Sequence, residues 1–133
     1  MYLLDTNICI FLIKNKNPYL KKKIFNCKKE ELFLSSITIA ELEYGVSKSQ
    51  CREKNRRALL DFCADFINII DFTAEDTETY GMIRAYLEKK GNIIGPYDMQ
   101  IAAHAYSMGA VLISRDQAFG KIPGLDVQDW IAG

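Results

Sequence analysis

The hydrophobic residues of the chain fall into two kinds of stretch, which alternate from one end to the other. Short runs rich in Leu, Ile, Val and aromatic residues are typical of buried strands. They lie at about residues 2–5, 32–36, 67–72 and 111–114, with a short final strand within 124–130. Between them, apolar residues at helical spacing predict helices at 8–14, 18–27, 37–49, 51–66, 74–90 and 97–109. This alternation favours a parallel sheet covered by helices on both faces.

Polar residues mark the starts of the predicted helices. Ser36 or Thr38 is placed to cap the helix at 37–49, and Thr73 is placed to cap the helix at 74–90. In the basic helix at 51–66, apolar residues recur along one face and predict a buried stripe. The members of this stripe are Leu59, Leu60, Phe62, Cys63 and Phe66.

Length and composition are those of an ordinary globular protein. The 133 residues are 49% hydrophobic and 26% charged, which predicts one domain over residues 1–133 with a single core. No apolar run approaches the ~18 residues of a membrane span, and Asp5 interrupts any signal peptide. We therefore expect a cytoplasmic protein that makes no membrane contact. The four cysteines form no C-x-x-C pair, which predicts reduced packing residues and no structural zinc.

The charged residues are unevenly distributed although the net charge is zero. The first 60 residues hold 12 Lys and Arg against 6 Asp and Glu, whereas the rest of the chain holds 5 against 11. Basic clusters at 21–29 and 52–57 would suit a phosphate backbone, but solvated helix faces explain them more simply. Charge alone therefore permits a nucleic-acid partner without identifying one.

Two acidic residues stand just after predicted strands. Asp5 ends the first strand, and Asp116 follows the fourth by two residues. Asp is depleted in strands and is rarely buried without a partner. In open α/β sheets, binding and catalytic sites lie beyond the carboxyl ends of the strands, so both side chains are expected at that edge.

Two further acids begin helices that rise from the same edge. Glu41 shares the apolar face of its helix with Ile37 and Tyr44, and Asp98 shares a face with Ile101. Taken singly, each of the four acids could be a cap, a turn residue or a partly exposed helix charge, and Asp98 in particular could be an N-cap. Four of them near one edge point instead to a common role.

The four acids together suggest a metal site. Neighbouring carboxylates repel one another and raise each other's pKa unless a cation lies between them. Carboxylate oxygens select a hard cation, which predicts Mg²⁺, with Mn²⁺ as a substitute. Thr6, Asn7 and Ser114 would orient the acids or hold ordered water. The single histidine, His104, stands in an Ala-rich helix and is expected to be a packing or surface residue. Metal-activated water is therefore the simplest mechanism for phosphodiester cleavage.

The sequence around these acids resembles the PIN-domain ribonucleases, and more narrowly the VapC-type toxins of bacterial type II toxin–antitoxin pairs. The resemblance covers nearly the whole chain and rests on four segments. They are LLDTNICI at 3–10, SSITIAELEYG at 35–45, GNIIGPYDMQIAAHA at 91–105 and LISRDQAFGKIPGL at 112–125. It implies a PIN-like three-layer α/β/α fold around a central, mostly parallel sheet of about five short strands.

The resemblance also implies a function: a Mg²⁺- or Mn²⁺-dependent endoribonuclease that cleaves RNA, often tRNA. Such a protein would form a homodimer and be inhibited by a cognate VapB-type antitoxin. The implied catalytic quartet is Asp5, Glu41, Asp98 and Asp116. Asp5 and Asp98 would hold the metal most directly, while Glu41 and Asp116 complete its coordination or position water. The nearest candidates for RNA contact are Lys14, Lys16 and Arg115.

Other phosphate-handling families fit less well. A haloacid-dehalogenase-like phosphatase needs a second Asp two residues after the first, where this chain has Asn7. A receiver domain needs a phosphoacceptor Asp after its third strand, but INIIDF continues into Thr73. No phosphate-binding glycine motif occurs. A catalytically inactive PIN-like module, which binds RNA or protein and whose acids are helix caps, stays open as the alternative.

Overall fold

The protein is built around a sheet of five parallel strands in the order β3-β2-β1-β4-β5, as a computed structural model of residues 1–131 describes it. Residues 132–133, the last two of the predicted domain, lie outside the described residues. The strands are β1 (Tyr2–Leu4), β2 (Leu32–Ser35), β3 (Ile69–Ile70), β4 (Val111–Ile113) and β5 (Val127–Gln128). The predicted sheet is thus confirmed, although the third strand, expected over 67–72, is only two residues long.

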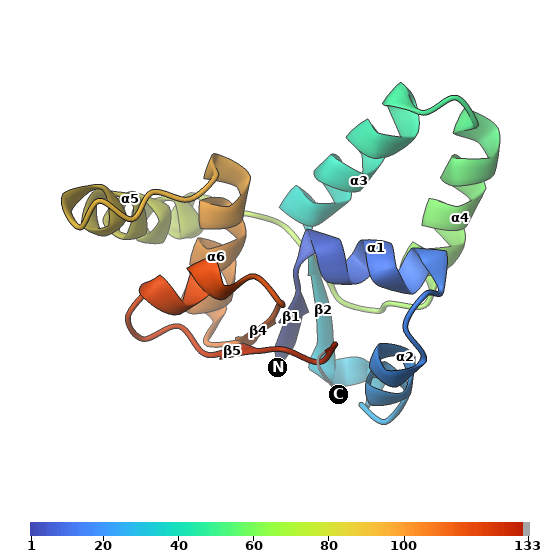
Figure 1. The fold of residues 1–133 in the computed structure, drawn as a ribbon, viewed down its shortest axis with the longest axis horizontal. Coiled ribbons are helices and arrows are strands. Elements are labelled where there is room, and N and C mark those ends of the chain that lie inside the picture. The colour runs from blue at the N-terminus through green and yellow to red at the C-terminus, as the bar shows by residue number, and fades with distance from the viewer. Residues whose placement is uncertain (132–133) are drawn as a thin grey trace.

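Within residues 1–131, six α-helices connect the strands. They are α1 (Thr6–Lys14), α2 (Pro18–Phe25), α3 (Ser36–Lys48), α4 (Arg52–Ala64), α5 (Ala74–Lys89) and α6 (Pro96–Met108). Two short 3₁₀ helices, η1 (Lys29–Glu31) and η2 (Gln117–Lys121), were not predicted. In Figure 1, α3 and α4 project together to one side of the sheet, while α6 and then α5 lie on the other. None of the described helices is long and apolar enough to cross a membrane.

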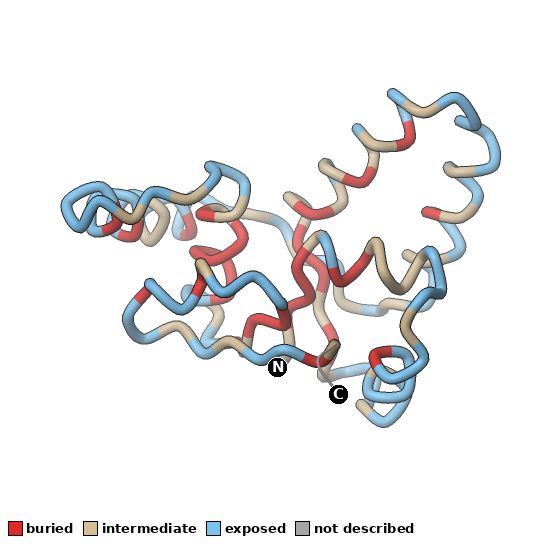
Figure 2. The backbone as a smooth tube through the Cα atoms, viewed as in Figure 1, coloured by how far each residue is buried: buried red, intermediate tan, exposed pale blue. Residues whose placement is uncertain are grey.

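The two faces of the sheet carry separate apolar clusters. Leu3 and Leu4 are adjacent and fully buried, and they point to opposite faces because side chains alternate along a strand. Leu3 packs with residues of α5 and α6, and Leu4 with residues of α1, α3 and α4. Figure 2 shows the buried positions concentrated on the central strands and on the sides of the helices that face them. These layers confirm the expected α/β/α architecture.

The start of α3 differs from the prediction by one residue. Ser35 is the N-cap, and its Oγ accepts a hydrogen bond from the backbone N–H of Ile37 at 3.1 Å. Ser36 Oγ instead accepts the backbone N–H of Phe72 at 3.0 Å, and Thr38 is buried inside the helix. The expectation that Ser36 or Thr38 caps the helix was therefore wrong. The last residue of β2 keeps an extended backbone and caps α3 directly, so that no loop separates strand from helix.

The predicted buried stripe of α4 includes one residue that is exposed. Leu59 is 3% exposed and belongs to the core, whereas the adjacent Leu60 is 57% exposed. Phe62 and Phe66 are half-buried and pack against the cluster on the α1 and α3 side of the sheet. Successive residues on a helix differ by about 100° in direction, so Leu60 points away from the buried face to which Leu59 belongs.

The four cysteines are free, as expected, but they are not all packing residues. Cys9 is fully buried, and Cys27 and Cys63 are half-buried. Cys51, at the N-cap of α4, is exposed to solvent.

Candidate active site

Asp5 lies where β1 ends and α1 begins. Its backbone N–H still donates to the carbonyl of Ile113 in β4 at 3.1 Å, so the residue continues the sheet by one position. Its side chain accepts the backbone N–H of Ile8 at 2.8 Å and caps α1. The residue is only 5% exposed. The carboxylate at the end of the first strand is therefore both a helix cap and a buried charge.

The surroundings of Asp5 disfavour its charged form. Burial raises its pKa to about 6, and the charges of Asp98 and Asp116 contribute to this rise. Hydrogen bonds from the Ser114 hydroxyl and the Ile8 amide act in the opposite direction without cancelling it. Asp98 and Asp116 are thus close enough to Asp5 to act on its protonation.

Asp98 stands in the first turn of α6. The N-cap of that helix is Gly95, and Pro96 occupies its first position, so Asp98 is not the N-cap that it could have been. The residue is half-buried, and burial is the main cause of its raised pKa. The charges of Asp116 and Glu41 raise it further. All four predicted acids therefore form one electrostatically coupled group.

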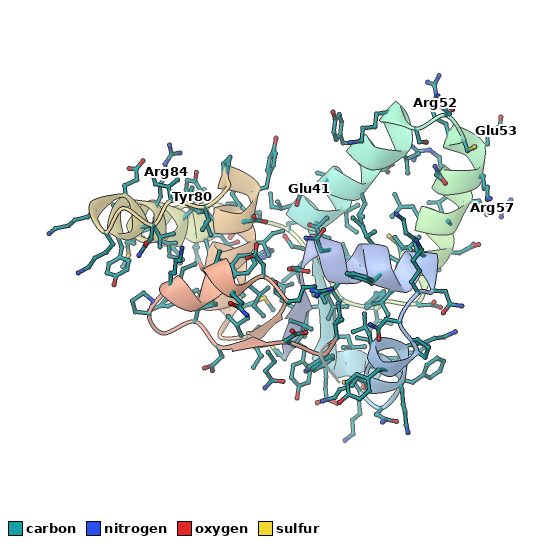
Figure 3. All side chains as sticks on the ribbon, in the orientation of Figure 1. Glu41, Arg52, Glu53, Arg57, Tyr80 and Arg84 are labelled. Carbon is teal, nitrogen blue, oxygen red and sulfur yellow. The ribbon has the colours of Figure 1, made fainter. Side chains whose placement is uncertain are left out.

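Glu41 is held by a residue of α1. Thr6 Oγ1 donates a hydrogen bond to Glu41 Oε1 at 2.7 Å, and it also lies 3.3 Å from Thr38 Oγ1. Glu41 stands in the part of α3 nearest the sheet, as Figure 3 shows. The nearby Glu43 is about 200° around the helix from Glu41, and its Oε1 is 2.7 Å from Arg56 of α4. Thr38 was not predicted as a site residue, although a polar residue one turn before Glu41 was the available signal.

The segment after β4 supplies the remaining polar groups. Ser114 is buried, hydrogen-bonds the Asp5 carboxylate and accepts the backbone N–H of Asp116 at 3.0 Å. Asp116 is exposed, and its side chain caps η2 by accepting the N–H of Ala118 at 2.9 Å. Asn7 is exposed in the first turn of α1. Thr6 and Ser114 thus each contact one of the predicted acids directly.

The donor set fits a hard divalent cation. Burial, together with the charges of neighbouring carboxylates, raises the pKa values of Asp5 and Asp98, and a bound cation would favour their charged forms. Within residues 1–131, no three Asp, Glu, His or Cys side chains converge into a ready-made metal site. Such an open arrangement is compatible with Mg²⁺, which takes one or two carboxylates and fills its other positions with water and substrate phosphate.

His104 is more than a packing residue. It is 3% exposed, and its Nδ1 lies 2.8 Å from Ser35 Oγ. A Ser–His pair can be a nucleophile and its base, but Ser35 is completely buried and substrate cannot reach it. The pair therefore has a structural role, and 69 residues separate its members, which is why no local pattern indicated it.

The three predicted basic contacts are all on the surface. Lys14, Lys16 and Arg115 are exposed, and the Arg115 guanidinium lies 5.9 Å from the centre of the Phe11 ring in α1. This contact places Arg115 beside α1, the helix that Asp5 caps. Arg115 also immediately precedes Asp116 in the chain.

Comparison with known proteins agrees with this geometry. The sequence model of the PIN domain matches residues 2–125. The chain is 43% identical over 133 residues to ribonuclease VapC2 of Rickettsia felis, covering 98% of each chain. It is 39% identical over 130 residues to the tRNA(fMet)-specific endonuclease VapC of Salmonella typhimurium, covering 97% of each.

The VapBC2 structure from Rickettsia felis, bound to a DNA fragment from its promoter, includes a similar chain. That chain aligns with a TM-score of 0.91 at 39% identity, over 97% of this chain and 98% of that one. The protein therefore belongs to the PIN-domain family, among its VapC ribonucleases.

Proposed function

We propose that this chain is the toxin of a toxin–antitoxin pair and hydrolyses RNA with the help of Mg²⁺ or Mn²⁺. The observation that carries the proposal is the coupling of Asp5, Glu41, Asp98 and Asp116 at the carboxyl edge of a parallel sheet. This is the place where open α/β sheets carry their sites. Burial of Asp5 beside other carboxylates costs stability, and a catalytic metal site gives a reason for retaining it.

The four acids fall into two pairs in the proposed mechanism. Asp5 and Asp98 would hold the metal, while Glu41 and Asp116 would complete its coordination or orient the attacking water. When bound, Mg²⁺ supplies an activated water and polarises the scissile phosphate. In-line attack would leave a 5′-phosphate and a 3′-hydroxyl. The Thr6 hydroxyl fixes Glu41, and the Ser114 hydroxyl donates to Asp5, so both carboxylates are oriented before substrate arrives.

The proposed substrate is RNA, and tRNA is the first candidate. The relatives from Salmonella typhimurium and Shigella flexneri are both named tRNA(fMet)-specific endonucleases. Lys14, Lys16 and Arg115 are the exposed cations that would contact the RNA backbone.

The proposed partner is a VapB-type antitoxin, because several similar structures are VapBC complexes. A cavity of about 400 Å³ lies among α1, α2 and α4, with Leu12, Phe25 and Phe62 in its lining. Phe25 is 77% exposed, which is unusual for so large an apolar side chain. An antitoxin segment could cover this surface. A homodimer is proposed on the family resemblance alone.

The decisive experiment is cleavage of purified total tRNA in Mg²⁺, Mn²⁺ or EDTA. We expect discrete fragments that disappear with EDTA and with Glu41→Gln. Glu43→Gln is the matched control, because it makes the same change two residues along the same helix, outside the site. Intact tRNA would redirect the assay to ribosomal and messenger RNA. Failure to cleave any RNA, together with failure to bind Mn²⁺, would refute the proposal.

The alternative of an inactive binding module has one observation in its favour: Asp5 and Asp116 do cap helices. A module of this kind would bind RNA equally well with or without a divalent metal and leave it intact. The same assay therefore distinguishes the two functions.

A further inference from the structure

His104 joins three segments that are far apart in the sequence. Its Nδ1 lies 2.8 Å from Ser35 Oγ, the N-cap of α3. Its Nε2 lies 3.7 Å from Asp76 Oδ2, in the first turn of α5. The ring also hydrogen-bonds the backbone of Asp71 and packs edge-on against Phe72, with ring centres 5.5 Å apart. None of these contacts belongs to the acidic site itself.

The contact with Ser35 links two helices that carry acids of the site. His104 lies on α6, whose first turn bears Asp98, and Ser35 caps α3, which bears Glu41. Ser35 Oγ also accepts the backbone N–H of Ile37, so one hydroxyl group both caps α3 and contacts α6. The helices that carry these two carboxylates are therefore joined by a buried hydrogen bond.

The hydrogen-bonding roles follow from the groups that surround the ring. Nε2 faces the Asp76 carboxylate, which hydrogen bonds from Thr73 hold in place. An ionised carboxylate only accepts hydrogen bonds, so the neutral ring is assigned its proton on Nε2. Nδ1 then accepts the proton of the Ser35 hydroxyl. Burial lowers the pKa of His104, more than its acidic neighbours raise it, which is consistent with a neutral ring.

We propose that His104 is a positioning residue for RNA cleavage, because its hydrogen bond to Ser35 sets α3 relative to α6 and thereby Glu41 relative to Asp98. The inference rests on the proposed function.

Side-chain amides allow the two sides of the ring to be tested separately. Asn can place an oxygen near the position of Nδ1, and Gln can place a donor near the position of Nε2. His104→Asn therefore keeps the Ser35 contact, whereas His104→Gln keeps the contact toward Asp76.

The test compares kcat, KM and thermal stability for these two variants and for Ser35→Ala. Both His104 variants lose a buried contact, so both should melt at a lower temperature than the wild type. We expect only His104→Gln and Ser35→Ala to lower kcat, by about 10- to 100-fold with little change in KM, because a small displacement of a catalytic group has effects of this size. The double variant His104→Gln/Ser35→Ala should be no slower than Ser35→Ala alone, because both changes remove the same hydrogen bond.

Two failures can be told apart. If the wild type cleaves RNA and the two His104 variants lose kcat equally, or not at all, the positioning role is wrong and the proposed function stands. If the wild type cleaves no RNA in the presence of metal, the proposed function fails, and the role of His104 in cleavage fails with it.

Discussion

Thr6 Oγ1 and Glu41 Oε1, 35 residues apart in the sequence, are joined by a hydrogen bond of 2.7 Å. Thr6 is the first residue of α1 and follows Asp5 directly, so the bond ties the end of β1 to α3. One short segment therefore supplies a carboxylate to the site and also orients a second carboxylate from another helix. The polar residue after Asp5 is explained by this contact.

Replacing Thr6 by Val should slow RNA cleavage about tenfold or more. Val has nearly the shape of Thr but cannot donate the hydrogen bond, and a bond to a charged group contributes about 1.5–3 kcal/mol. Thr6→Ser keeps the hydroxyl and should stay near the wild-type rate. Initial rates of tRNA cleavage at fixed metal concentration measure both variants. Equal rates for the two would show that the bond does not orient Glu41.

Asp5→Asn should make the metal-free protein more stable at pH 7.5 while abolishing cleavage. The pKa of Asp5 in the folded protein, about 6, lies above its ordinary value of 3.8, so the folded state binds more protons than the unfolded state between these pH values. Stability contributed by this group therefore falls as the pH rises from about 4 to about 6. Asn can still cap α1 through its side-chain oxygen and carries no charge.

The expected gain for Asp5→Asn at pH 7.5 is about 1–3 kcal/mol in the free energy of unfolding, since one pKa unit corresponds to about 1.4 kcal/mol. The gain should disappear near pH 4. Urea unfolding at both pH values in EDTA measures it. Asp61→Asn, at an exposed position of α4, controls for a general effect of net charge. A variant that is less stable than the wild type at pH 7.5 would contradict the assignment of Asp5 as a buried charge that destabilises the folded protein.

Saturating Mn²⁺ should raise the melting temperature of the wild-type protein. A ligand that binds only the folded state stabilises it by about 2.7 kcal/mol at a hundredfold excess over its Kd. Asp98→Asn removes a proposed ligand and should reduce this shift strongly. Glu75→Gln, which alters an acid in the first turn of α5, should leave the shift unchanged. Thermal melts with and without Mn²⁺ measure all three proteins, and an equal shift in Asp98→Asn would remove Asp98 from the proposed metal ligands.

The parts of the fold that were predictable have local causes. Alternating strands and helices predicted the layers. The rule that sites lie at the carboxyl ends of strands predicted that Asp5 and Asp116 lie at the same edge of the sheet. The order of the strands was not predictable, because it depends on which faces pack against each other over long distances in the chain. The contact between His104 and Ser35 was missed for the same reason.

Errors of one residue arose where two similar side chains compete. Ser35 and Ser36 are both residues that favour the N-cap position. Ser35 occupies it because β2 ends at Ser35, whose backbone is still extended. Leu59 and Leu60 are both apolar, and only the orientation of α4 on the core exposes Leu60. Patterns along a sequence locate such elements to within a residue or two, and tertiary packing then selects the residue.

This pair of leucines gives a direct test of the packing of α4. Leu59→Ala should lower the free energy of unfolding by about 2–5 kcal/mol, because it removes a buried side chain and leaves a cavity. Leu60→Ala should change it by less than about 0.5 kcal/mol, as exposed substitutions usually do. Urea unfolding of both variants makes the comparison. Comparable losses would mean that Leu60 is covered in solution, for example by a second protein chain.

Arg115→Gln should weaken RNA binding and make it less dependent on salt. Each phosphate contact contributes about 0.7 on single strands and about 0.9 on a duplex to the slope of log affinity against log salt concentration, because a bound cation is released. Loss of one contact should reduce the slope by about that amount. Arg84→Gln is the matched control, because Arg84 is exposed on α5 and pairs with Glu88 at 3.5 Å, and Figure 3 shows it well separated from Glu41. Both substitutions are made in Glu41→Gln protein, which should bind tRNA without cleaving it. The tRNA affinity of each protein over a range of salt concentrations gives its slope. If Arg84→Gln reduced the slope as much as Arg115→Gln, the RNA would not be bound preferentially at the acidic site.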